Sequence, residues 1–124
     1  MHKDVLNLND ALIALKSNKI DEALKILLEV YQLDPKNLDV IRNISNIYRE
    51  KKNISKYNFY LTKAASIDRK NYKLLNNLAL TYKDLDNYKQ AEKYFLKSFQ
   101  INRKYVLVNF NLGLLYEEKG EFEK

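Results

Sequence analysis

Hydrophobic residues recur along this chain at intervals of three and four, the spacing that places side chains on one face of an α-helix. Residues 72–86 show the pattern at Leu75, Leu78 and Tyr82, and residues 87–101 contain a second run of the same kind. The second run comprises Ala91, Tyr94, Phe95, Ser98 and Phe99. Asp and Asn residues between the two runs are typical of helix ends. The pattern therefore predicts two amphipathic helices joined by a short turn.

The same pattern returns at a fixed interval along the chain. The segments 41–50, 75–84 and 109–118 align with one another, and their chemistry agrees column by column. The aligned sets are Ile44/Leu78/Leu112, Ser45/Ala79/Gly113 and Tyr48/Tyr82/Tyr116. Because neither helix of a pair buries its apolar stripe alone, the pairs are expected to stack into an all-α solenoid. The predicted repeats within the single array of residues 1–124 are 4–37, 38–71, 72–105 and a partial repeat, 106–124.

These residues resemble the tetratricopeptide repeats, whose signature joins L-G-x-x-Y to a later Ala, a Phe and a terminal Pro over a period of about 34 residues. The segments that carry the resemblance are "NLGLLY" (111–116), "NLALTY…AEKYF" (77–95) and "IDEALKILLEVYQLDP" (20–35). It covers residues 4–124 and implies a right-handed superhelix of antiparallel helix-turn-helix units. One departure stands out: Tyr57 occupies the column of Ala23 and Ala91, so we expect the second hairpin to be splayed or its neighbours to be smaller.

The end of the sequence permits two interpretations. Gly120 falls in a turn column and Phe122 in the column of Ile20, Ile54 and Tyr88, which predicts a fourth hairpin whose second helix has just begun. Alternatively, residues 106–119 form a capping helix. The complete "NLGLLY" contact set favours the first interpretation, a piece of a longer protein. Its last helix would then expose an apolar face, formed by Leu112, Gly113 and Tyr116, through which the chain could self-associate.

Composition and charge limit the kinds of partner that the chain is expected to bind. The net charge is +6, but residues 38–105 hold 15 Lys/Arg against 6 Asp/Glu. This basic middle is either an ordinary solvated surface or a surface that attracts an acidic partner. Nucleic acid is not expected as a partner, because the tyrosines fall in core columns rather than between the basic residues. No membrane association is expected, because the chain lacks an uncharged apolar stretch of about 18 residues, the length that a spanning helix needs.

Catalytic chemistry is not expected either. The chain has no cysteine and a single histidine, His2, so it offers no metal-ligand set and no evident general base. Its two glycines cannot form a phosphate-binding loop. We therefore predict a non-enzymatic protein without a cofactor. The absence of cysteine suits a reducing compartment, and a cytoplasmic location is expected.

One polar column runs through all four repeats: Asn9, Asn43, Asn77 and Asn111. An asparagine side chain offers a donor and an acceptor, so it can pair with the N–H and C=O of an extended peptide. The column resembles the asparagine ladder of the O-linked N-acetylglucosamine transferases, which implies a peptide-binding groove. The alternative is that an Asn-rich chain, with 15 in 124 residues, aligns four by repeat consensus or chance.

Other residues of the first helices complete the predicted groove. The candidates are Arg42, Asn46, Arg49, Lys73, Asn76, Lys83 and Phe110. Capture of a heat-shock-protein C-terminus is disfavoured, because Leu8 and Leu12 occupy the positions of the Lys and Asn that the family's carboxylate clamp needs. The predicted function is a peptide-binding scaffold with an acidic protein or peptide as its partner. The alternative is a self-association or substrate-positioning module of a larger enzyme, such as a glycosyltransferase or another transferase.

Overall fold

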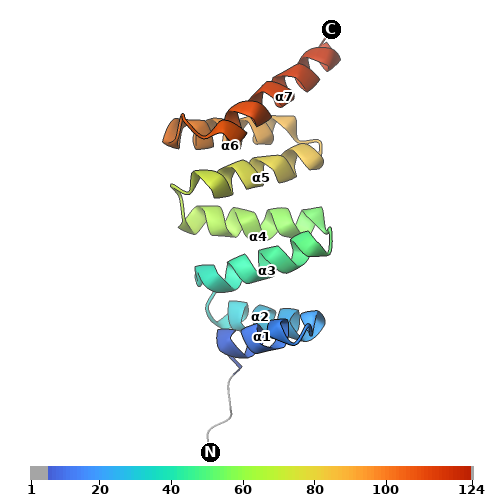
Figure 1. The fold of residues 1–124 in the computed structure, drawn as a ribbon, viewed down its shortest axis with the longest axis vertical. Helices are drawn as coiled ribbons and strands as arrows, with labels where there is room; N and C mark the ends of the chain where they lie inside the picture. The colour runs from blue at the N-terminus through green and yellow to red at the C-terminus, as the bar shows by residue number, and fades with distance from the viewer. Residues whose placement is uncertain (1–5, 124) are drawn as a thin grey trace, which may run out of the picture.

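The computed structural model describes residues 6–123, with side chains described for residues 6–120. Residues 6–123 form seven α-helices and no strand. In chain order these are α1 (Leu8–Lys16), α2 (Ile20–Leu33), α3 (Leu38–Glu50), α4 (Ile54–Ile67), α5 (Tyr72–Asp84), α6 (Tyr88–Ile101) and α7 (Val106–Glu123). The helices stack along one axis with α1 and α7 at opposite ends (Figure 1). The predicted all-α solenoid is confirmed.

The helix boundaries follow the period of the sequence. The first helices α3, α5 and α7 begin at residues 38, 72 and 106, and the second helices α2, α4 and α6 begin at residues 20, 54 and 88. Each helix packs against the next one in the chain, most extensively within the pairs α1/α2, α3/α4 and α5/α6. The repeating unit is therefore a helical hairpin, as expected of a repeat that contacts only its neighbours.

Asparagine side chains start five of the helices. In each case the side-chain oxygen accepts a hydrogen bond from the backbone N–H three residues later, at 3.1–3.3 Å. These N-caps are Asn7, Asn37, Asn53, Asn71 and Asn87. Such caps satisfy backbone donors that the first turn leaves unpaired. A third of the 15 asparagines thus serve helix initiation.

The turns inside the hairpins place a left-handed residue at the same point of each repeat. Asn18, Lys52 and Asp86 have φ angles of 58°, 59° and 61°. The prediction that Gly120 forms the next such turn is wrong, because α7 continues through it to Glu123. Glycine permits a left-handed conformation without imposing one. In the earlier hairpins a second helix packs back on the first, whereas no described helix follows α7. The side chain of Phe122 lies outside the described ones.

Lys52 is expected to be a strained position. A residue with a Cβ atom at positive φ destabilises the folded state by about 1–2 kcal/mol. Replacement by glycine removes this strain, but the greater flexibility of glycine in the unfolded chain offsets part of the gain in stability. Lys52→Gly should therefore raise the free energy of unfolding by about 0.5–1 kcal/mol. Urea denaturation measures the change, and Asn18→Gly is the matched control with a smaller expected gain, since asparagine tolerates this conformation. A lower urea midpoint for Lys52→Gly would contradict the assignment of strain.

Tyrosine pairs repeat along the core as well. Tyr48 stacks on Tyr60 with ring centroids 5.7 Å apart, and one repeat later Tyr82 stacks on Tyr94 at 5.6 Å. Burial, followed by the neighbouring phenols, raises the pKa of Tyr60 and of Tyr94 above the usual value. The corresponding Tyr116 of α7 is 46% exposed. The tyrosine column therefore joins the first helix of a repeat to its second helix, and its third member, Tyr116, has no stacked tyrosine among the described residues.

Candidate functional site

A cleft of about 270 Å³ opens between α3 and α5, with α4 as its third side. Five of the predicted site residues line it: Arg42, Asn46, Arg49, Lys73 and Asn77. The rest of the lining is Ser45, Tyr57, Leu61, Ala64, Asn71 and Leu74. None of these residues is acidic, while three are cationic. We call this the basic cleft.

A second cleft of about 240 Å³ adjoins the first. It is lined by Arg49, Ile54, Tyr57, Asn77, Leu80, Thr81 and Asp84, so Arg49, Tyr57 and Asn77 belong to both clefts. Ile54, Leu80 and the Tyr57 ring give it an apolar character, and we call it the apolar cleft. Its one acidic residue is Asp84, at the C-terminal end of α5.

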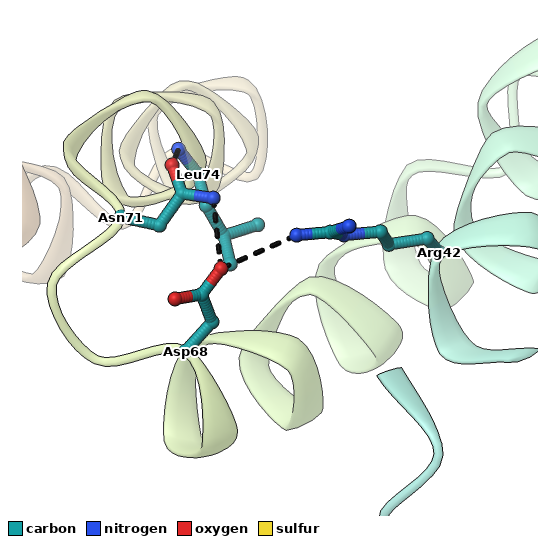
Figure 2. A network of polar contacts seen from close by, with 4 residues as sticks. All are labelled: Arg42, Asp68, Asn71 and Leu74. Carbon is teal, nitrogen blue, oxygen red and sulfur yellow. Dashed lines mark hydrogen bonds and ion pairs between the residues drawn. The ribbon is translucent and has the colours of Figure 1, made fainter. Parts of the chain in front are cut away.

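Asp68 binds two residues of the basic cleft, Arg42 and Asn71 (Figure 2). Its Oδ2 accepts from Arg42 Nη2 at 3.3 Å and from Asn71 Nδ2 at 3.0 Å, while Asn71 Oδ1 caps α5 by accepting from the Leu74 N–H at 3.1 Å. The Arg42 and Asp68 side chains are 49% and 34% exposed, so the ion pair adds little stability. Its consequence is positional: Arg42 is held beside the cleft with further N–H donors available to a ligand.

The other two cations of the basic cleft are only lightly engaged. Arg49 lies 3.6 Å from Glu50, and the two side chains are 53% and 76% exposed. Lys73 is exposed and makes no ion pair among the described residues. Three cations and no carboxylate line the basic cleft, and of the two nearby carboxylates Asp68 pairs with Arg42 and Glu50 lies beside Arg49, so the lining favours an anionic group.

The four asparagines of the predicted ladder have different surroundings. Asn9 and Asn77 are exposed, and their side chains make no hydrogen bond within the described part of the chain. Asn43 Nδ2 donates to the Asp39 carbonyl at 2.7 Å, inside α3. Asn111 Nδ2 donates to Asn76 Oδ1 at 3.0 Å. Asn77 is the ladder member that lines the two clefts, and the ladder itself stays a prediction.

Two predicted groove residues are placed differently from the expectation. Asn76 is 1% exposed and bonded to Asn111, so the prediction that it lies on the groove surface is wrong. The cause is the approach of α7, which covers this end of α5. The Lys83 side chain is 19% exposed and its Nζ lies 3.0 Å from Glu118 of α7, so its charge is already engaged.

The α7 surface agrees only in part with the prediction. Phe110 is 61% exposed, but it does not line the basic or the apolar cleft. Gly113 is exposed and Tyr116 is 46% exposed, as expected. Leu112, however, is only 8% exposed, because it packs with Phe95 in the core, so its predicted exposure is wrong.

Several lining residues were not among the sequence candidates. Asn71 reaches the basic cleft because it caps α5, and Ile54, Leu80 and Asp84 reach the apolar cleft through packing between hairpins. The sequence did single out Tyr57, because it occupies a repeat position that is alanine in the other hairpins, at Ala23 and Ala91. The prediction for it concerned hairpin geometry, whereas the structure places it in the lining of both clefts.

The described residues contain neither a candidate metal site nor a candidate membrane-spanning helix. Among residues 6–123, no group of three or more His, Cys, Asp or Glu side chains is placed to hold a metal ion. None of the helices over the same range has the length and apolar character needed to cross a membrane. His2 lies outside the described residues.

The repeated hairpins and the cleft between first helices define a helical-repeat solenoid. Residues 72–105 match the tetratricopeptide repeat family model, and together with the solved structures this confirms the predicted resemblance to that family. No curated protein sequence matches the chain.

Solved structures extend the likeness in fold to nearly the whole chain. A tetratricopeptide repeat protein from Parabacteroides merdae is 23% identical, with a TM-score of 0.78 over 94% of this chain and 45% of its own. The protein MamA of AMB-1 is 17% identical, with a TM-score of 0.81 over 94% of this chain and 66% of its own. The first repeat domain of Spaghetti (RPAP3), bound to the HSP90 peptide SRMEEVD, is 16% identical, with a TM-score of 0.72 over 95% and 99%. The chain thus spans less than half the length of the first of these structures.

Proposed function

We propose that this chain is a non-enzymatic scaffold that binds an extended, acidic segment of a partner protein across α3 and α5. The observation that carries the proposal is the basic cleft, where Arg42, Arg49 and Lys73 converge without any carboxylate in the lining. Carboxylates and guanidinium groups form the stronger, charge-assisted class of hydrogen bond. An acidic side chain of a partner is therefore the group that this cleft suits best.

The amides in the same cleft suit the backbone of such a segment. Asn46 and Asn77 are exposed and lie among the cations, and each can offer a donor and an acceptor to a peptide unit. Neighbouring helices are about 8–10 Å apart, and an extended chain advances about 3.3 Å per residue. One ladder asparagine would then meet about every third residue of the bound segment.

A solved neighbour supports an acidic peptide as the kind of ligand. The Spaghetti (RPAP3) repeat domain is bound to a peptide, SRMEEVD, that carries three acidic residues. In this chain the first helix presents Leu8, which is half-buried, and Leu12, which is 36% exposed, where a carboxylate clamp would need polar groups. We therefore propose recognition of acidic side chains within a segment rather than of a terminal carboxylate.

Self-association is the second candidate function. Val106, Leu107 and Phe110 of α7 are 74%, 54% and 61% exposed, an unusual run of large apolar side chains on one helix. Such a surface would suit contact with another copy, or with a larger protein that contains this array. Light scattering over a range of concentrations tests it: a constant monomer mass would remove this candidate.

The ladder is tested by Asn77→Ala in a peptide-binding titration. Fluorescence anisotropy with a labelled Gly/Ser peptide that carries isolated glutamates should give a three- to tenfold weaker affinity for the variant than for wild type, since removal of one hydrogen-bonding partner costs about 0.5–1.5 kcal/mol. Asn43→Ala should have a smaller effect, because the Asn43 amide already bonds within its own helix. Equal affinity of Asn77→Ala and wild type would remove the ladder, and no binding by wild type would remove the proposed function.

A further inference from the structure

Tyr57 breaks the repeat at one point. Its counterparts one repeat away on either side, Ala23 and Ala91, are completely buried in their hairpins. Tyr57 itself is half-buried, and its side chain lines both the basic and the apolar cleft. A large aromatic side chain at a position that elsewhere takes a methyl group cannot be buried in the same way, and here it forms a wall shared by two clefts.

A second change of residue occurs at the same place, between the first helices. Between α5 and α7, Asn76 and Asn111 meet in a 3.0 Å hydrogen bond. The residues one repeat earlier are Arg42 and Asn77, and both line the basic cleft instead of bonding to each other. Arg42 bonds to Asp68. The cleft between α3 and α5 therefore coincides with two departures from the neighbouring repeat, Arg42 for Asn76 and Tyr57 for Ala91.

We infer that the two clefts form one bipartite subsite, which takes an acidic side chain beside an apolar side chain of the bound segment, and that Tyr57 determines this selectivity. Each cleft is smaller than the roughly 300–1,000 Å³ of a small-molecule site, which fits single side chains rather than a cofactor. The inference rests on the proposed function, because it specifies the ligand of that same surface.

The lining determines which side chain fits which cleft. The carboxylate faces Arg42, Arg49 and Lys73 in the basic cleft. The apolar side chain packs on Ile54, Leu80 and the Tyr57 ring in the apolar cleft. Asp84 places a negative charge in the lining of the apolar cleft, so it disfavours binding of a second carboxylate there. The expected motif is one acidic and one apolar residue, and not a run of acidic residues.

The spacing of the motif follows from the geometry of an extended chain. Side chains two residues apart point to the same side of an extended peptide. The two clefts adjoin, because they share Arg49, Tyr57 and Asn77, so one extended segment is expected to reach both. The acidic and apolar residues are thus expected two positions apart in the ligand.

A titration with three labelled, C-terminally amidated peptides tests the motif. In a Gly/Ser background they carry Glu-x-Leu, Glu-x-Ser or Glu-x-Glu. Wild type should bind Glu-x-Leu about tenfold more tightly than either of the others, which corresponds to about 1.4 kcal/mol. Equal affinity for Glu-x-Leu and Glu-x-Ser would overturn the bipartite subsite while leaving the proposed function in place. No binding of any of the three would overturn both.

Variants of the protein assign the selectivity to its residues. Tyr57→Ala should lose most of the preference for leucine, whereas Tyr57→Phe, which keeps the ring, and Phe59→Ala, which removes a 48% exposed aromatic elsewhere on α4, should retain it. Asp84→Asn is a second test at an exposed position, where folding is not at risk. It should strengthen Glu-x-Glu binding at least threefold and leave Glu-x-Leu unchanged. Retained leucine preference in folded Tyr57→Ala, or no change for Glu-x-Glu in Asp84→Asn, would overturn the assignment.

Discussion

Replacement of Phe95 by alanine is expected to lower the free energy of unfolding by about 3–5 kcal/mol, the range for deletion of a buried phenylalanine side chain. Phe95 is completely buried in a cluster with Ala79, Ala91, Val108 and Leu115. The cluster joins α5, α6 and α7, so the cavity would weaken the contacts that hold α7 on the stack. Because repeats contact only their neighbours, the loss of stability should be greatest in the C-terminal part of the array, which α5, α6 and α7 form.

Urea denaturation followed by circular dichroism measures this effect. Leu96→Ala is the matched control, since Leu96 neighbours Phe95 on α6 but is 36% exposed. Its expected cost is about 1 kcal/mol, the centre of the range for single substitutions. Similar urea midpoints for the two variants would contradict the core described for α5, α6 and α7.

Reversal of the charge of Arg49 should weaken binding of the Glu-x-Leu peptide by about 10- to 100-fold, because a like charge placed against a carboxylate costs several kcal/mol where the site is desolvated and less where it is open. Arg49 is chosen because it lines both clefts. Its ion pair with Glu50 is long and exposed, so Arg49→Glu should change stability little.

The control for this variant is Lys89→Glu, which makes the same change in net charge at an exposed position of α6 outside both clefts. Anisotropy titrations at two salt concentrations separate local from long-range effects. Lys89→Glu should lose less than threefold, and that loss should shrink at high salt as the Debye length falls. An equal loss for both variants would mean that the peptide senses the net charge of the protein rather than the cleft.

Helix positions are the part of the fold that the sequence predicts best. The apolar spacing and the period of the repeat determine α2, α4 and α6, which begin at Ile20, Ile54 and Tyr88, members of one aligned column. Asparagine caps add a local signal for the start of a helix. This reasoning fails at Gly120, where a turn was predicted and α7 continues. Glycine only permits a turn, and whether the chain turns there depends on tertiary packing that the local sequence does not specify.

The candidate site is less predictable for the same reason. Arg42 and Asn76 occupy one column, yet one lies at an open cleft and the other is covered by α7. The exposure of each residue depends on how closely the next helix packs, and the residue's position in the repeat does not determine that packing. The five cleft residues predicted from the first helices come together, while the contribution of α4 through Tyr57 depends on how the second hairpin packs.

Amide chemical shifts recorded during a titration of the Glu-x-Leu peptide into ¹⁵N-labelled protein test the central claim most directly. The changes are expected to cluster on α3 and α5, at Arg42, Asn46, Arg49, Lys73 and Asn77, and at Tyr57 of α4. Changes centred on the exposed residues of α7, or spread evenly over the basic surface, would contradict a peptide-binding site between α3 and α5.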